Sequence, residues 1–296
     1  MKTPFRQDVL AGKRILVSGG GSGLGKEITR GLAAHGATVY ICGRREGVLA
    51  DAATDIMSST SARVIPLGCN LREPDSVSAM ADKIWQEGPL DGLINNAAAN
   101  FIAPTKDLSP RGYEAIRSTV MDGNFYATLE IGKRWIAEGH KGSIVSNLVT
   151  WVWTGSAFVV PSAMAKTALH AMTMSLAVEW GRYGIRLNAV APGPFPTDGA
   201  WEKLNPIPEA SVGATQSDDV PLRRFGQMHE LQNLMVFLQA DGCDYITGQT
   251  IGIDGGHHLA APSTFAGLVN LTDEQWARAK DAVKASAARE KAQRTI

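Results

Sequence analysis

Val17-Ser-Gly-Gly-Gly-Ser-Gly-Leu-Gly25 is the stretch that decides the fold. It follows a short apolar run, Arg14–Ser18, and it opens a segment with helical periodicity, Gly25–His35. Glycine lets the backbone turn sharply and approach a bound group closely, because no Cβ stands in the way. The helix that follows offers free N–H groups and the positive end of its dipole at the same point. A strand, a glycine-rich turn and a helix in this order predict a binding site for the pyrophosphate of a dinucleotide.

Apolar runs alternate with helical periodicity along most of the chain. Besides Arg14–Ser18, we expect strands at residues 38–42, 62–67, 90–95, 142–147, 185–191 and 249–254. Amphipathic helices are expected at residues 46–58, 74–87, 111–138 and 162–180. Strands joined by helices of this length make βαβ crossovers, so the pattern predicts an α/β fold with a Rossmann-type doubly wound parallel sheet of about seven strands. Ligands of such sheets bind beyond the carboxyl ends of the strands.

Charge and composition exclude several classes of protein. The 29 basic side chains equal the 29 acidic ones, whereas a nucleic-acid binder normally carries a basic excess. No run approaches the ~20 apolar residues of a membrane span, and the N-terminus lacks the apolar core of a signal peptide. The three cysteines are scattered, and His170, His257 and His258 have no partners at metal-ligand spacing. We therefore expect a cytoplasmic protein with no nucleic-acid partner, no membrane partner and no metal.

The C-terminal part of the chain differs from the rest. We expect one Rossmann domain over residues 1–270, in which residues 194–220 form a flexible segment, and a helical tail over residues 271–296. Within the tail, Thr272-Asp-Glu-Gln275 has the spacing of a capping box, in which Thr272 and Gln275 bond to each other's backbone N–H groups. The residues beyond it are mostly alanine and charged, as in a solvated helix end.

The residues that end the predicted strands suggest which dinucleotide binds. Arg44 and Arg45 follow the second strand, where a site for NAD usually has a carboxylate for the ribose 2′-hydroxyl. An arginine instead suits a 2′-phosphate, so we predict NADPH. The other interpretation is that the pair only begins a solvated helix. The cofactor-binding residues expected from the turn and from the strand ends are Gly19, Gly20, Gly21, Ser22, Gly23, Leu24, Gly25, Arg44, Arg45, Asn70, Leu71, Asn96 and Ala97.

Four motifs together resemble the short-chain dehydrogenase/reductase family. They are Gly19-x-x-x-Gly23-x-Gly25, Asn95-Asn-Ala-Ala98, Pro192-Gly-Pro194, and Thr247-Gly248 with Asp254-Gly-Gly256. The combination is far more specific than any one motif. The resemblance implies that Pro192, Gly193, Phe195 and Thr197 complete the cofactor site.

A closer resemblance is to the 2,4-dienoyl-CoA reductases. It rests on Asn95-Asn-Ala-Ala-Ala-Asn-Phe-Ile-Ala-Pro104, Thr128–Lys133, Gly155–Ser162, Glu179–Gly181 and Leu271–Trp276, and so covers nearly the whole chain. This resemblance implies NADPH-dependent reduction of an unsaturated acyl-CoA in fatty acid beta-oxidation, and a homotetramer.

The helix after the fifth strand lacks the usual acid of the larger family. Most members have Tyr-x-x-x-Lys here, with the tyrosine as proton donor, but this chain has Ser162-Ala-Met-Ala-Lys166. The usual serine is replaced by Val149 and the usual asparagine by Met121, so ordinary carbonyl reduction is disfavoured. Dienoyl-CoA reductases also carry serine in place of the tyrosine. The resemblance implies that Lys166 binds the nicotinamide ribose and that Ser162 polarises the thioester carbonyl.

Two departures from the dienoyl-CoA reductases leave the proton donor open. Trp151 stands where the mitochondrial enzymes have a catalytic tyrosine, and an indole N–H does not supply a proton usefully. Asp122 replaces an asparagine that helps to hold the thioester oxygen. It is either a functional acid or a polar helix residue, with Asn124 and Tyr126 as reserve candidates. The predicted catalytic set is Lys166, Ser162 and Asp122.

The predicted substrate site extends from the cofactor toward the surface. Arg72 and Lys203 match basic positions that bind CoA phosphates, or they are solvated surface charges. Trp151, with Trp153 beside it, forms an aromatic wall for a bulky acyl group, or else serves packing. The expected substrate-binding residues are Arg72, Asn100, Phe101, Trp151 and Lys203.

Two other functions stay open at this point. One is reduction of a carbonyl or unsaturated substrate that carries no CoA. The other is a cofactor-binding scaffold or sensor without turnover, which Trp151, Val149 and Met121 favour.

Overall fold

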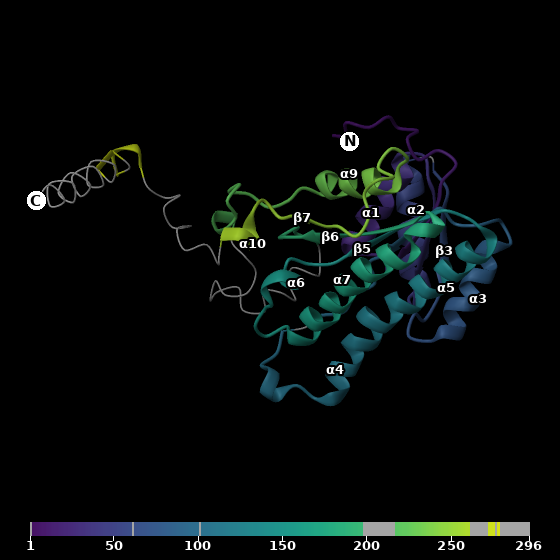
Figure 1. The fold of residues 1–296 in the computed structure, drawn as a ribbon, viewed down its shortest axis with the longest axis horizontal. Coiled ribbons are helices and arrows are strands. Elements are labelled where there is room, and N and C mark those ends of the chain that lie inside the picture. Colours follow the sequence, from purple (N-terminus) through teal and green to yellow (C-terminus); the bar gives the residue numbers. More distant parts are fainter. Residues whose placement is uncertain are drawn as a thin grey trace, which may run out of the picture. The chain divides into compact units, whose positions relative to one another are not determined.

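A seven-stranded sheet forms the centre of the protein, in the order β3-β2-β1-β4-β5-β6-β7. All six pairings are parallel, which confirms the predicted doubly wound sheet (Figure 1). The strands are β1 Arg14–Ser18, β2 Thr38–Gly43, β3 Val64–Gly68, β4 Gly92–Asn95, β5 Gly142–Asn147, β6 Ile185–Pro192 and β7 Thr250–Ile253. This computed structural model describes residues 2–60, 62–100, 102–197, 217–260, 272–275 and 277–278.

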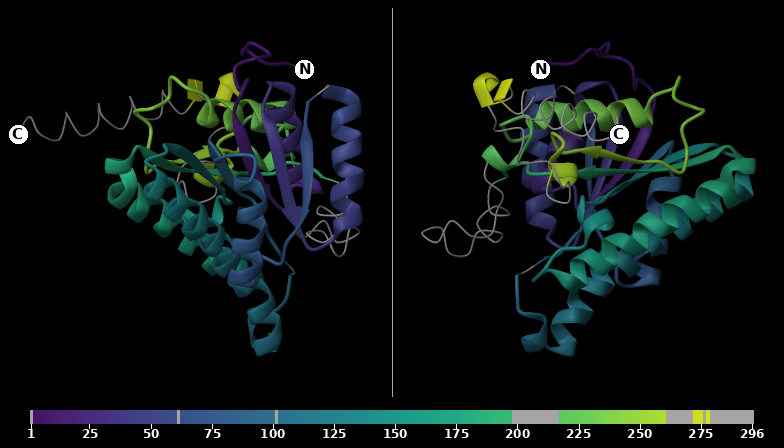
Figure 2. Two further views of the ribbon diagram at one scale, coloured as in Figure 1. Left: turned by 90° about the vertical axis from the view of Figure 1, so that its right-hand side faces the viewer. Right: turned by 60° about the vertical axis from the view of Figure 1, so that its left-hand side comes forward.

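Helices cover both faces of the sheet because its strands are apolar on both sides. In β1, Ile15 and Val17 enter one buried cluster and Leu16 enters the other, since neighbouring side chains of a strand point to opposite faces. Helices α1, α2 and α9 pack into the first cluster, and α3, α5 and α7 into the second. Figures 1 and 2 show these two layers from three directions.

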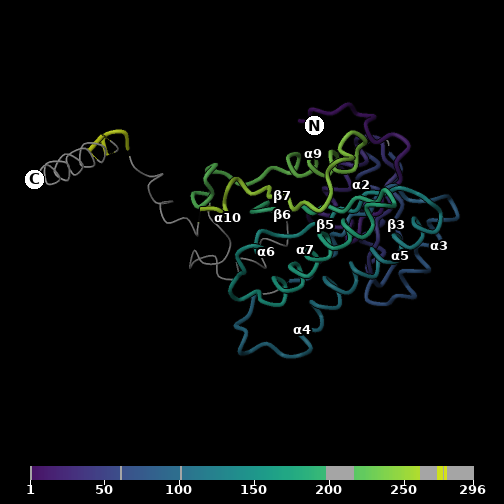
Figure 3. The backbone as a smooth tube through the Cα atoms, viewed as in Figure 1, coloured from purple at the N-terminus to yellow at the C-terminus, as the bar shows by residue number. Residues whose placement is uncertain are grey.

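Helices α1, α2, α3, α5 and α7 lie close to the predicted ranges, whereas α6, α9 and α10 were not predicted. Their bounds are α1 Gly23–Ala34, α2 Glu46–Thr60, α3 Pro74–Trp85, α4 Pro110–Ile116, α5 Gly123–Glu138, α6 Trp151–Thr154, α7 Val160–Trp180, α9 Met228–Gln239 and α10 His257–Ala260. Short 3-10 turns occur at η1 Thr105–Asp107, η3 Gly181–Tyr183 and η5 Ser217–Asp219. The tube in Figure 3 follows the chain through these crossovers.

The helical stretch expected over residues 111–138 is present, but its middle is not α-helical. A π-helical turn, η2 Arg117–Asp122, separates α4 from α5. Its first and last side chains form an ion pair, in which Arg117 Nη1 lies 2.6 Å from Asp122 Oδ2. A separation of five residues places side chains together in a π turn, and such turns occur frequently at functional sites.

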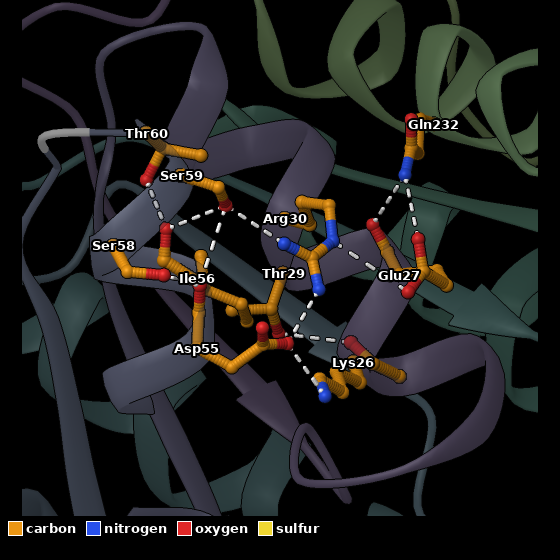
Figure 4. Close-up of polar contacts among 11 residues, drawn as sticks. Lys26, Glu27, Thr29, Arg30, Asp55, Ile56, Ser58, Ser59, Thr60 and Gln232 are labelled. Carbon is orange, nitrogen blue, oxygen red and sulfur yellow. Dashed lines mark hydrogen bonds and ion pairs between the residues drawn. The ribbon is translucent and has the colours of Figure 1, made fainter. Parts of the chain in front are cut away.

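Helix α1 is anchored on both sides, which fixes its N-terminus at the sheet edge. Asp55 of α2 accepts ion pairs from Lys26 and Arg30, each at 2.7 Å, and these lower the pKa of Asp55. Gln232 of α9 donates to the backbone oxygen of Glu27 at 3.0 Å. Figure 4 shows these contacts around α1. Single ion pairs at a surface contribute little stability, so their main effect is to orient the helix.

The chain divides into two units, residues 1–258 and 259–296. The boundary expected between residues 270 and 271 lies outside the described residues. In the second unit, Thr272 N donates to Gln275 Oε1 at 2.8 Å and Gln275 N donates to Thr272 Oγ1 at 3.3 Å. The predicted capping box is therefore present. Among the described helices, none is long and apolar enough to cross a membrane.

Candidate active site

The glycine turn lies where the crossovers of β1 and β4 diverge, at the carboxyl edge of the sheet. Gly19 adopts φ +67° and Gly23 φ +53°, a left-handed conformation that side chains rarely take. A Cβ on Gly19 would lie 3.1 Å from Ala97 Cα, and one on Gly25 would overlap Gly19 O and Asn96 Nδ2. The turn therefore packs so closely on α1 and on the end of β4 that only glycine fits.

The N-terminus of α1 fits a bound anion. Ser22 precedes the helix in an extended conformation and makes no side-chain cap hydrogen bond, and the first turn holds no acidic residue. The backbone N–H groups of this turn and the helix dipole are thus available to a pyrophosphate. Thr197 lies beside the turn, with its hydroxyl 3.9 Å from the position of a Cβ on Gly23.

A buried hydrogen-bond network ties the ends of β1 and β4 together. Ser18 Oγ accepts from the backbone N–H groups of Asn96 and Ala97, each at 2.9 Å, and donates to Asn124 Oδ1 at 3.1 Å. Asn96 Nδ2 donates to Ser18 O at 3.0 Å. Asn124 Nδ2 also donates to Ala97 O at 2.9 Å and to Val120 O at 2.7 Å. Asn124, a reserve catalytic candidate, is therefore fully buried and committed to holding the turn.

Lys166 lies at the same carboxyl edge of the sheet. It is 6% exposed, on α7, and its Nζ donates to the backbone oxygen of Asn147 at the end of β5. Burial lowers the pKa of Lys166 to about 8. Ser162 precedes it by one helical turn and is also buried, so both side chains face the sheet. The structure brings together these two of the three predicted catalytic residues.

Comparison with known proteins agrees with this geometry. Residues 19–258 match a family model described as enoyl-(acyl carrier protein) reductase. A Caenorhabditis elegans protein named probable 2,4-dienoyl-CoA reductase, (3E)-enoyl-CoA-producing, is 37% identical, with 98% of this chain and 96% of that protein covered. A Bacillus anthracis short chain dehydrogenase structure is 38% identical, with a TM-score of 0.74 over 83% of this chain and 96% of that one. The chain is a short-chain dehydrogenase/reductase.

A second structural neighbour carries a cofactor. A gluconate 5-dehydrogenase from Burkholderia cenocepacia, in complex with NADP and tartrate, is 29% identical, with a TM-score of 0.76 over 85% of this chain and 97% of that one. The glycine turn, the open N-terminus of α1 and buried oxygens without a donor among the described residues, such as Asn95 Oδ1 and Asn147 Oδ1, fit a nicotinamide dinucleotide in this dehydrogenase/reductase as well.

The segment after β6 closes the other side of the crevice. Pro192 ends the strand, Gly193 N donates to Ile253 O at 3.1 Å, and Phe195 is buried. A Cβ on Gly193 would press on Asp254 of the following motif. These contacts hold Gly193 against β7 and the residue that follows it, at the carboxyl end of the sheet.

Two arginines follow β2 in this dehydrogenase/reductase. Arg44 and Arg45 are exposed directly after β2. Asn70 is oriented by Glu73, to which its Nδ2 donates at 2.6 Å. Leu71 is buried, and a Cβ on Gly123 would press on it.

Arg72 connects the segment after β3 to the π turn η2. Its Nε donates to Thr119 Oγ1 at 2.9 Å and its Nη2 to Ala115 O at 3.3 Å. Asn100 is another residue expected in the substrate site, and its Oδ1 is buried without a partner among the described residues. Phe101 and Lys203, two further expected residues of the acyl-CoA site, lie outside the described residues.

Asp122 has a partner that bears on its predicted role. Its side chain is 15% exposed and paired with Arg117, which also forms an ion pair with Glu114 at 2.8 Å. An ion-paired carboxylate suits electrostatic positioning better than proton donation. The geometry thus favours the interpretation of Asp122 as a structural helix residue.

Trp151 lines a cavity, but on another side of α7. The cavity has a volume of about 530 Å³ and is lined by Trp151, Val152, Gly155, Ser156, Val160, Ala163, Met164 and Thr167. By helical spacing, its α7 residues centre on a different side of the helix from Ser162 and Lys166, with Ala163 between the two sides. Trp153 instead packs on His258, with ring centroids 4.5 Å apart.

Ser18 and Asn147 were not among the predicted site residues, and Asn124 was only a reserve candidate. Each is a polar residue buried at the crevice. The signal in the sequence is a polar side chain that ends or follows an apolar strand, as Ser18 and Asn147 do. Which partners they take depends on the register of three strands and is not visible in the chain alone.

Proposed function

We propose that the protein is an NADPH-dependent reductase of a 2,4-dienoyl-CoA or enoyl-CoA thioester. The observation that carries this proposal is the buried pair Ser162 and Lys166 on one face of α7, with serine where a carbonyl reductase has its tyrosine. Without that acid, direct protonation of an alkoxide has no donor. Delivery of hydride to carbon needs only a site that stabilises negative charge on the thioester oxygen. The similarity to a probable 2,4-dienoyl-CoA reductase supports the same chemistry.

Each residue of the proposed site has a separate role in the reaction. NADPH would supply a hydride when bound, and Lys166 would hold its ribose. Addition of that hydride to the distal carbon of the conjugated system would place negative charge on the thioester oxygen. The Ser162 hydroxyl donates a hydrogen bond to that oxygen, and the positive charge of Lys166 stabilises it from nearby. The enolate carbon then takes a proton from water.

Turnover of acyl-CoA substrates tests the proposal. We expect NADPH oxidation with 2,4-hexadienoyl-CoA or with a member of a panel of enoyl- and aryl-acyl-CoAs, measured by the loss of absorbance of the reduced nicotinamide. The corresponding free acids serve as the control and should react far more slowly. No turnover with any thioester, despite tight binding of NADPH, would overturn the proposal.

Arg44 is proposed to select NADPH over NADH. Loss of a charge-assisted hydrogen bond to the 2′-phosphate costs roughly 1.5–3 kcal/mol, so Arg44→Ala should weaken NADPH binding by about 10-fold to 150-fold. NADH lacks the phosphate and is the internal control: its affinity should stay nearly constant. Fluorescence titration of both dinucleotides measures the ratio. An equal loss for both would show that Arg44 does not read the phosphate.

The homotetramer and the cytoplasmic location are also proposals. In support of an oligomer, α7 exposes Met164, Met174 and Val178 along one side, and a helix that is apolar all round is normally covered. Light scattering of the purified protein measures the assembly directly.

A further inference from the structure

Asn147 is a buried amide that the proposed mechanism does not use. It is the last residue of β5 and is 4% exposed. Ile144 and Val145, earlier in the same strand, are fully buried and apolar. Burying an amide costs more than burying a hydrocarbon side chain unless all its polar atoms are bonded. An asparagine at this position therefore requires an explanation.

The hydrogen-bond network sets the orientation of the Asn147 amide. Asn96 Nδ2 donates to Ser18 O and to Gly19 O, at 3.0 and 3.3 Å, and carbonyl oxygens only accept. Asn96 must therefore turn its Oδ1 toward Asn147, whose Nδ2 donates to it at 2.9 Å. As a result Asn147 Oδ1 is the atom left over, buried and without a donor among the described residues.

The same residue also holds the catalytic lysine. The backbone oxygen of Asn147 accepts from Lys166 Nζ. An ammonium group has three protons to donate, and this oxygen is the one acceptor found for them among the described residues. A continuous series of hydrogen bonds thus connects the glycine turn, through Asn96 and Asn147, to Lys166. Its ends are the two places where the pyrophosphate and the nicotinamide ribose are expected to lie.

We propose that Asn147 is a positioning residue that couples Lys166 to the glycine turn, and that its free Oδ1 accepts a hydrogen bond from the nicotinamide riboside half of the cofactor. The cofactor then supplies the donor that is absent among the described residues. The amide sets the spacing between the two ends of the dinucleotide and directs the remaining protons of Lys166 toward the ribose. The inference rests on the nicotinamide cofactor of the proposed function and does not depend on an acyl-CoA substrate.

Two ligands that share only the adenosine end test the proposal. NADP⁺ carries the nicotinamide riboside, whereas adenosine 2′,5′-bisphosphate lacks it. Asn147→Leu, which keeps the approximate shape, should weaken NADP⁺ binding about tenfold, the effect of one lost hydrogen bond. The affinity for adenosine 2′,5′-bisphosphate should change by less than about twofold. Calorimetric titration of each ligand into the free protein gives both values without any assay of turnover.

Asn188 provides a matched control. It is a fully buried amide on β6, bonded to Ile246 O at 2.8 Å and to Gln249 N at 3.1 Å. Asn188→Leu should lower the melting temperature and leave the ratio of the two affinities unchanged. Asn147→Ser serves as the second variant if Asn147→Leu does not fold, and the same split between the ligands is expected of it.

The outcomes separate this inference from the proposed function. Equal losses for both ligands, or no loss for either, would overturn the role of Asn147 while the wild-type protein still binds NADP⁺. A wild-type protein that binds neither ligand would overturn both proposals. Activity on acyl-CoA with unchanged NADP⁺ affinity in Asn147→Leu would leave the proposed function standing and remove the inference.

Discussion

Replacing Lys166 with methionine is expected to abolish reduction and, at the same time, to stabilise the folded protein at pH 7. Lys166 is proposed to hold the nicotinamide ribose and to stabilise charge on the substrate, and such groups contribute roughly 10²-fold to 10⁴-fold to the rate. The same lysine is buried as a cation, with a single hydrogen bond to Asn147 O among the described residues. Methionine has a similar length and no charge to desolvate.

The pH dependence of the stability difference identifies the cause. Burial lowers the pKa of Lys166 from 10.5 to about 8. Below pH 8 both the folded and the unfolded states hold the proton, and the full cost of burying the charge is present. Between pH 8 and 10.5 the unfolded state binds more protons, so the free energy of unfolding of the wild type rises with pH. The total rise from this residue is on the order of 3 kcal/mol.

The difference between the two proteins isolates this contribution, because all other titrating groups are common to both. Lys166→Met should be more stable than the wild type by about 1–3 kcal/mol at pH 7, since loss of the bond to Asn147 O offsets part of the gain. The advantage should fall as the pH rises from 8 to 10.5. Urea unfolding at a series of pH values measures it. A constant difference across that range, or full activity of the variant, would contradict this account of Lys166.

The sheet was predictable because its strands are buried on both faces. Such strands appear as continuous apolar runs, and β1 and β5 were predicted with their observed bounds. Helix α9 was missed, although Leu231 and Met235 belong to the core, because it follows a segment that was interpreted as flexible. The π turn was missed for another reason. Helical periodicity over residues 111–138 does not distinguish an α turn from a π turn, and the contact of Asn124 with Ala97 that accompanies the turn joins distant parts of the chain.

The site was predictable only where backbone geometry dictates the residue type. Glycine at positions 19 and 25 follows from the turn alone, and both fit as expected. The hydrogen-bond partners of Asn96 do not follow from the turn, because they depend on how β4 pairs with β1 and β5. The placement of Trp151 illustrates the same limit. Its position in the chain suggested either a wall of the acyl pocket or a packing role, and only the structure shows that it lines a cavity together with residues of α7.

Gly25→Ala is expected to have the largest effect on cofactor binding. A Cβ at this position overlaps Gly19 O and Asn96 Nδ2. Neither atom is the end of a flexible side chain that can turn away: the first is backbone, and the second is held by hydrogen bonds to Ser18 O and Gly19 O. The turn or the start of α1 must therefore shift. Overpacking of this kind costs typically 1–3 kcal/mol of stability, and displacement of the N–H groups that receive the pyrophosphate should weaken dinucleotide binding by roughly 100-fold or more.

Gly181→Ala is the matched control, since a Cβ there meets nothing within 4 Å and the residue has φ −55°. It lies at the far end of α7 and should raise the free energy of unfolding slightly, by roughly 0.4–1 kcal/mol, without changing NADPH affinity. Fluorescence titration and urea unfolding of both variants give the comparison. Binding also separates two explanations for Gly25→Ala. If affinity falls while stability is retained, the turn has moved without disturbing the sheet. Wild-type affinity in a folded Gly25→Ala protein would show that the pyrophosphate does not bind at this turn. Lys166 and Asn147 are placed at the nicotinamide end on the assumption that it does, so that placement would then lose its basis.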